Sequence, residues 1–141
     1  MFANILVPVD TGNEESWRKA LPDAVKLARA HGAKLHVMTV VPDFGSSIVA
    51  SYFPEGFQTN ALEQAKKELA TLVERHVPAD VDHDQIATHG GIWQEICRVA
   101  KEVGADLVVM ASHKPAFHDV LLTPTAHQVL HHLPVSVMVV R

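Results

Sequence analysis

Residues 105–130 read ADLVVMASHKPAFHDVLLTPTAHQVL, an apolar run followed by a polar connection and then a helical pattern. The run ADLVVMAS is rich in Leu and Val, which is typical of a buried strand. Thr123 followed by Pro124 indicates an N-cap and the first residue of a helix over 124–132. The stretch therefore predicts a central strand, a connection that lacks glycine, and a short helix.

Strand and helix patterns alternate along the whole chain. Strands are predicted over residues 2–10, 33–42, 80–89, 105–112 and 134–141. Helices are predicted over 14–32, 60–77, 92–104 and 124–132. Pro22 lies inside the first helical pattern and favours a kink or a late start there. The polar third strand is expected at an edge of the sheet.

This alternation predicts a parallel sheet with helices on both faces. No domain boundary or internal repeat is visible, so we expect one domain over residues 1–141. Residues 43–60 are long for a loop in a compact domain, and whether they act as a lid stays open at this point.

The composition excludes several classes of function. Lys and Arg number 12 against 16 Asp and Glu, which gives a net charge of −4. This balance argues against binding to nucleic acid or to an anionic membrane surface. The apolar runs are too short to span a bilayer, and no signal peptide is visible, so we expect a cytoplasmic protein. The single cysteine, Cys97, lies in a helical pattern and is expected to be buried.

Polar groups gather where ligands bind in an open parallel sheet, beyond the carboxyl ends of its strands. Asp10 follows the first strand, Val41 lies at the end of the second, and residues 112–114 follow the fourth. Asp10 could bind a ribose hydroxyl, or it could cap the TGN turn that follows it. The N-terminus of the last helix could hold a phosphate, although Pro124 removes one N–H from it.

Three stretches resemble the universal stress protein (UspA-like) family: NILVPVD at 4–10, GADLVVMASHKP at 104–115 and LLTPTAHQVLHHLPVSVMVVR at 121–141. The resemblance covers the chain in the order and length of its elements. It is closest to the subgroup whose fourth-strand loop reads Ala-Ser-His-Arg/Lys-Pro. It implies an α/β three-layer sandwich with a five-stranded parallel sheet of order 3-2-1-4-5, similar to adenine nucleotide alpha hydrolases and Rossmann-like folds.

Many members of this family bind ATP through a Gly-x-x-Gly motif and a later Gly-Ser or Gly-Thr pair. The three glycine positions hold Ala111, Lys114 and Thr123 here, and Pro124 replaces the hydroxyl residue of the pair. Glycine lets backbone N–H groups approach a phosphate closely, so we expect weak or altered nucleotide binding. The resemblance implies that an adenine nucleotide such as ATP would contact the following residues: Pro8, Val9, Asp10, Val41, Met110, Ala111, His113, Lys114, Thr123 and Thr125.

Five of the ten histidines lie late in the chain. His127 and His131 are four residues apart, a spacing that places them on one face of a helix. Two such imidazoles can bind a transition metal with a third ligand, such as His118 or Asp119. The expected core stripe of this helix is Ala126, Val129, Leu130 and Leu133. The two histidines then lie beside the core, and we expect solvated side chains and no metal.

The last strand, PVSVMVVR, does not alternate apolar with polar residues, so we expect both of its faces to be covered. An edge strand offers a row of free N–H and C=O groups to another chain. The family resemblance implies a homodimer through this strand, from Val135 to Val140.

No residue stands out as a nucleophile. Ser112 and His113 are adjacent in a strand and point to opposite faces. We therefore expect a homodimeric regulatory or stress-response binding module rather than an enzyme. The first alternative is a full ATP binder, with slow ATPase activity, in which Lys114 and Thr125 replace the missing glycines. The second alternative is a metal-responsive module that uses the late histidines.

Overall fold

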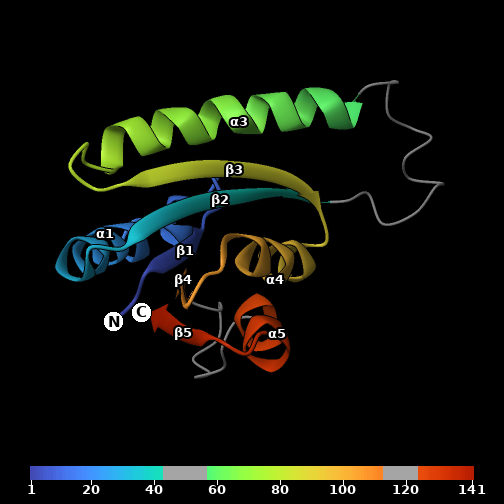
Figure 1. Cartoon of the computed structure of the whole chain (residues 1–141). Helices are drawn as coiled ribbons and strands as arrows, with labels where there is room; N and C mark the ends of the chain where they lie inside the picture. Colours follow the sequence, from blue (N-terminus) through green and yellow to red (C-terminus); the bar gives the residue numbers. More distant parts are fainter. Residues whose placement is uncertain (43–56, 113–123) are drawn as a thin grey trace.

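A computed structural model of the chain describes residues 1–42, 57–112 and 124–141 (Figure 1). The strands are β1 (Asn4–Pro8), β2 (Lys34–Pro42), β3 (His83–Gly90), β4 (Leu107–Ala111) and β5 (Ser136–Val140). The helices are the 3-10 helix η1 (Glu14–Ser16) and the α-helices α1 (Ala20–His31), α3 (Phe57–His76), α4 (Ile92–Val103) and α5 (Pro124–His132).

The five strands form one parallel sheet of order β3-β2-β1-β4-β5. This order confirms the predicted fold class. It also confirms the edge position of the polar third strand and the interior position of the fourth. From β1 the chain first adds β2 and β3 on one side of the sheet and then β4 and β5 on the other side. The carboxyl ends of β1 and β4 therefore border the crevice where such sheets bind ligands.

Helices cover both faces of the sheet, and each face has its own core. Along β1, Ile5 and Val7 point to the face covered by α1 and α3, whereas Leu6 points to the face covered by α4 and α5. Figure 1 shows α3 running along β3 and β2, and it covers the same face of the sheet as α1. The near-continuous apolar sequence of the inner strands is explained by burial on both sides.

The first helix starts late, as Pro22 predicted. Residues 14–16 form η1, and α1 begins only at Ala20. Pro22 therefore lies in the first turn, where its missing N–H has no intrahelical partner to lose. Gly32 ends α1 with a φ of 65° and donates its N–H to the Ala28 carbonyl. A side chain would be strained in this left-handed conformation, which explains a glycine at the predicted stop.

The expected burial of β5 on both faces is wrong. Val137 and Val139 are half-buried and pack against the core beneath α4 and α5, but Ser136 and Met138 are exposed. On the other side of the sheet, α1 packs on β1, β2 and β4. On this second face only Val140, at the end of the strand, packs against the core, so β5 is open at Ser136 and Met138.

One residue of the expected stripe on α5 is also misplaced. Ala126, Val129 and Leu133 are buried, whereas Leu130 is 43% exposed. Successive helical residues are rotated by about 100°. Leu130 therefore lies beside the narrow stripe of buried residues through which α5 contacts the core.

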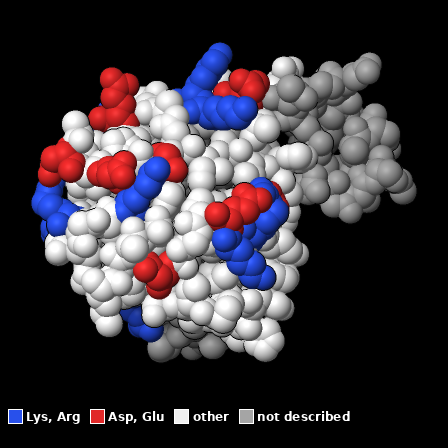
Figure 2. Space-filling model, in the orientation of Figure 1, with Lys and Arg blue, Asp and Glu red and all other residues white. Residues whose placement is uncertain are grey.

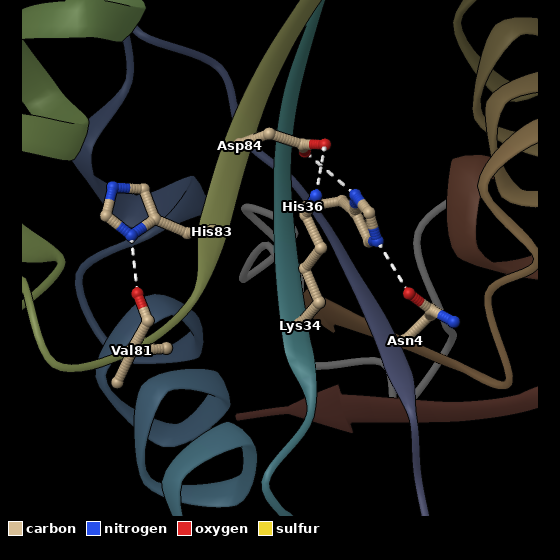
Figure 3. A network of polar contacts seen from close by, with 6 residues as sticks. All are labelled: Asn4, Lys34, His36, Val81, His83 and Asp84. Carbon is tan, nitrogen blue, oxygen red and sulfur yellow. Dashed lines mark hydrogen bonds and ion pairs between the residues drawn. The ribbon is translucent and has the colours of Figure 1, made fainter.

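A polar network joins β1, β2 and β3 through a buried histidine (Figure 3). The His36 side chain is 5% exposed, and its Nδ1 donates to the Asp84 carboxylate at 2.8 Å. Its Nε2 lies 3.0 Å from Oδ1 of Asn4. Lys34 lies 3.7 Å from the other oxygen of Asp84. Three neighbouring strands are thus linked by side chains as well as by their backbone ladders.

Asp106 fastens the entry of β4 to the start of β1. Its carboxylate accepts from the N–H of Ala3 at 2.8 Å and from that of Asn4 at 3.1 Å. Burial acts to raise the pKa of this carboxyl, but the two hydrogen bonds outweigh it and the pKa lies below the ordinary 3.8. The ionised form is therefore the one that stabilises this corner of the fold.

We expect Asp106→Ala to lower the free energy of unfolding by about 1–2 kcal/mol near neutral pH, because two backbone donors lose their acceptor. Since the folded pKa is lowered, the contribution is present above pH 3.8 and is lost as pH falls through the folded value. Urea unfolding at about pH 7 and about pH 3 measures this. A difference between wild type and variant that stays constant down to the lower pH contradicts the assignment.

Candidate functional site

A cavity of about 190 Å³ opens at the carboxyl ends of β1, β2 and β4. Two helices complete it, with Ile92 and Ile96 from α4 and Thr125 from the first turn of α5. The cavity lies at the reversal of strand order, where ligands are expected in this architecture. Six residues predicted from the sequence line it: Pro8, Val9, Asp10, Met110, Ala111 and Thr125.

Of the other four predicted residues, only Val41 belongs to the described parts of the chain. Val41 lies on β2 between Val40 and Pro42, which both line it, so alternation along the strand points Val41 to the other face. His113, Lys114 and Thr123 lie outside the described residues. The predicted N-cap on Thr123 therefore stays a prediction, whereas α5 does begin at Pro124 as expected.

The turn after β1 is held by Ser16, a buried residue that the sequence analysis missed. Ser16 Oγ accepts from the Asp10 N–H at 2.8 Å and lies 2.7 Å from the Asn13 carbonyl, to which it donates. Asp10 Oδ1 accepts from the Gly12 N–H at 3.0 Å. Asp10 therefore caps the TGN turn, one of the two roles considered for it. At the same time its exposed side chain borders the cavity.

The start of α4 is fixed by a tight turn. Gly90 has a φ of 142°, and a Cβ there would lie 3.1 Å from Glu95 Cγ. Arg98 donates to both oxygens of Glu95, at 3.0 and 2.8 Å. These bonds hold the pKa of the Glu95 carboxyl below its usual value. This arrangement brings Ile92 and Ile96 over the cavity. No local motif in the sequence predicts this placement.

The lining is largely apolar, with Val9, Val40 and Ile96 as walls and Asp10 as the acidic group at the rim. Such a lining suits a flat apolar group that is oriented by a few polar contacts. The volume is below the range of about 300–1,000 Å³ that is common for ligand pockets. A ligand the size of a nucleotide would therefore be only partly enclosed by the described residues.

The model of the universal stress protein family matches residues 1–141. The chain belongs to the universal stress protein family. This membership confirms the family resemblance of the sequence and agrees with the observed sheet.

A curated relative agrees with this family assignment, and a solved structure shares the fold. Universal stress protein G of Escherichia coli O157:H7 is 30% identical over 146 residues and covers 100% of both chains. The solved structure of the hypothetical protein MJ0577 has a TM-score of 0.80 at 22% identity, and the match covers 99% of this chain and 96% of that one.

Two further universal stress protein structures were solved with adenine nucleotides. One is in complex with cAMP, with a TM-score of 0.62, 22% identity and coverage of 99% and 97% of the two chains. The other, from Archaeoglobus fulgidus, is in complex with dAMP, with a TM-score of 0.64, 17% identity and coverage of 99% and 98%.

Three of the late histidines of this universal stress protein lie on the exposed surface of α5. His127 and His131 are exposed, and their ring centroids lie 6.5 Å apart in nearly parallel planes. His132 instead stacks on Trp93 of α4 at 4.3 Å. Within the described parts of the chain, no group of three or more metal-ligating side chains occurs. His118 and Asp119, the predicted third ligands, lie outside these parts.

Acidic and basic side chains lie next to one another on the surface of this universal stress protein (Figure 2). On the face shown in Figure 2, basic and acidic side chains intermix, and neither sign forms an extended patch. Among residues 1–42, 57–112 and 124–141, no helix is long and apolar enough to cross a bilayer. Cys97 is buried as predicted, and burial raises the pKa of its thiol, which disfavours the reactive thiolate.

Proposed function

We propose that this universal stress protein is a regulatory, stress-response module that binds the nucleoside part of an adenine nucleotide beside Asp10. The observation that carries the proposal is the convergence of Asp10, Met110 and Thr125, from three separate elements, on one cavity. We further propose a single cytoplasmic domain over residues 1–141 that binds ligand without acting as an enzyme.

The lining supports a nucleoside. The apolar side chains of Val9, Val40 and Ile96 offer surfaces against which a base can pack. Asp10 Oδ1 is engaged by Gly12, and the second carboxylate oxygen can accept a bond from a ribose hydroxyl. The cAMP and dAMP complexes of the related structures support adenine as the base.

The described residues offer fewer groups that could bind the phosphates of a nucleotide. Pro124 opens α5 and has no N–H, so the first turn offers fewer donors than a glycine-rich start. Thr125 lines the cavity and can supply one hydroxyl. We therefore propose that the second and third phosphates of ATP add little affinity. The alternative is a full ATP binder, with slow hydrolysis, in which Lys114 and Thr125 hold the triphosphate.

Calorimetric titration of AMP and ATP tests these proposals. We expect AMP and ATP to bind with affinities within about threefold of each other, and Asp10→Ala to weaken both by at least about tenfold, because a hydrogen bond to a charged group is lost. Asp82→Ala, an exposed carboxylate before β3, is the matched control and should leave both affinities unchanged. Mass spectrometry of freshly purified protein identifies any nucleotide that copurifies.

Two results would decide against the proposal. ATP that binds at least about tenfold more tightly than AMP, with the difference lost in Lys114→Ala, establishes the alternative. Failure of both nucleotides to bind at millimolar concentration removes the proposed ligand class altogether.

We also propose that two chains associate through β5. The strand lies at the edge of the sheet, and its sequence, SVMVV, carries no charge. Its exposed Met138 adds an apolar side chain to the free backbone groups of the edge.

A further inference from the structure

A second cavity, of about 450 Å³, lies on the other side of the turn that follows β1. It is bordered by Thr11 and Trp17 from this turn and by one flank of α3. The same turn places Asp10 and Ser16 in the wall of the first cavity. One short segment thus separates two hollows, and the second has no part in the proposed nucleotide site.

The acidic group of this second cavity is already engaged. Glu68 accepts from Thr11 Oγ1 at 2.8 Å and from Gln64 Nε2 at 3.3 Å. Both of its oxygens therefore have neutral donors, and the bond to Thr11 ties α3 to the turn. A carboxylate held in this way is not placed against a basic side chain of the groove.

The basic groups, in contrast, lack acidic partners. Lys67 and Arg75 line the groove, and within the described parts of the chain neither forms an ion pair. Lys66, the neighbour of Lys67, is paired with Glu63 at 3.2 Å. With Glu68 included, the described lining of the groove carries one net positive charge, in a protein whose net charge is −4.

Trp17 forms part of the groove wall, and its indole N–H has no acceptor among the described residues. The Nε1 atom is buried. An indole N–H can only donate, and such a group is rarely left unpaired in a folded protein. The Trp17 ring packs against His76 at a centroid distance of 4.7 Å, which places a second nitrogen-bearing ring in the same wall.

We propose that this groove binds a small polyanion that carries at least two phosphate groups. Lys67 and Arg75 are eight residues apart on α3, or about 12 Å along the helix axis. Their long side chains can both reach inward, so a ligand with two linked phosphate groups can contact Lys67 at one end and Arg75 at the other. A pyrophosphate-like ligand satisfies both cations and lies beside Trp17.

Trp17 provides the signal for the experiment. The chain has two tryptophans, so a Trp93→Phe background leaves Trp17 as the single indole. We expect pyrophosphate to change its fluorescence in a saturable manner, with orthophosphate and citrate each at least about fivefold weaker. Lys67→Gln and Arg75→Gln should each weaken pyrophosphate binding about tenfold. Lys66→Gln, the paired neighbour, is the matched control and should leave it unchanged.

Calorimetry on the otherwise unaltered chain repeats the measurement if Trp93→Phe impairs folding. Asp10→Asn keeps a side-chain oxygen for the Gly12 N–H and so preserves the turn. It should bind pyrophosphate normally, which separates this groove from the nucleotide cavity. The proposal is overturned if pyrophosphate shows no saturable binding below about 1 mM. It is also overturned if Lys66→Gln weakens binding as much as Lys67→Gln, if citrate matches pyrophosphate, or if Asp10→Asn abolishes binding.

Discussion

Replacing Val137 with proline is expected to convert the protein from a pair of chains into single chains. The Ser112 N–H donates to the Val140 carbonyl at 2.8 Å, so the backbone groups of Val140 face β4. Because this direction alternates along a strand, the N–H of Val137 faces away from β4, toward the open edge. Proline there removes a donor from the proposed dimer contact while leaving the ladder to β4 intact.

Sedimentation equilibrium measures the change. The unaltered chain should sediment at twice the chain mass of 15.4 kDa, and the proline variant at the single mass. Val137→Ala keeps the N–H and shortens the side chain, so it should remain paired. Met138→Lys serves as a second test that spares the core, since Met138 is 38% exposed. An unchanged mass for both folded variants, Val137→Pro and Met138→Lys, removes β5 as the interface.

His36→Ala is expected to produce the largest loss of stability among the substitutions considered. It deletes a ring that is hydrogen-bonded at both nitrogens and is almost fully buried between three strands. The loss of these bonds together with the space left behind corresponds to about 3 kcal/mol. For a chain of this size, that loss lowers the melting temperature by about 10 °C. Thermal unfolding followed by circular dichroism measures it.

A double-mutant cycle with Asp84→Ala isolates the bond between the two side chains. We expect a coupling of about 1–2 kcal/mol, because each single variant leaves the partner group without its bond. His83→Ala is the control, since His83 is only partly buried and bonds to the carbonyl of Val81, two residues away. A loss below about 0.5 kcal/mol for His36→Ala would show that the network contributes little.

The sequence predicted the elements well because their signals are local. The spacing of apolar residues, Pro22 in a first turn and the glycines at helix ends each act within a few residues. The strand order is not local, and it came from the family resemblance rather than from periodicity. The errors on Met138 and Leu130 concern which neighbours reach the outermost strand and helix. That information lies in the packing, which no single stretch encodes.

In the candidate site, too, local signals were predictable from the sequence and long-range contacts were not. Met110 and Ala111 end β4, and Asp10 lies two residues beyond β1, so the topology alone placed them near the crevice. Ser16 and Ile92 enter through the geometry of a turn and the angle of a helix, which depend on contacts distant in sequence. The hydroxyl of Ser16 was invisible as a site residue because serine is common in turns for local reasons.

The two edges of the sheet differ in a way that limits polymer growth. β3 carries His83, Asp84, Gln85 and His89, whereas β5 carries no ionisable side chain. Charges along an exposed strand discourage further strands from adding to it. In the proposed dimer, association through β5 alone would be self-complementary and close after two copies, whereas joining unlike edges would generate an endless fibre. We therefore expect the polar sequence of β3 to disfavour the growth of filaments from pairs joined at β5.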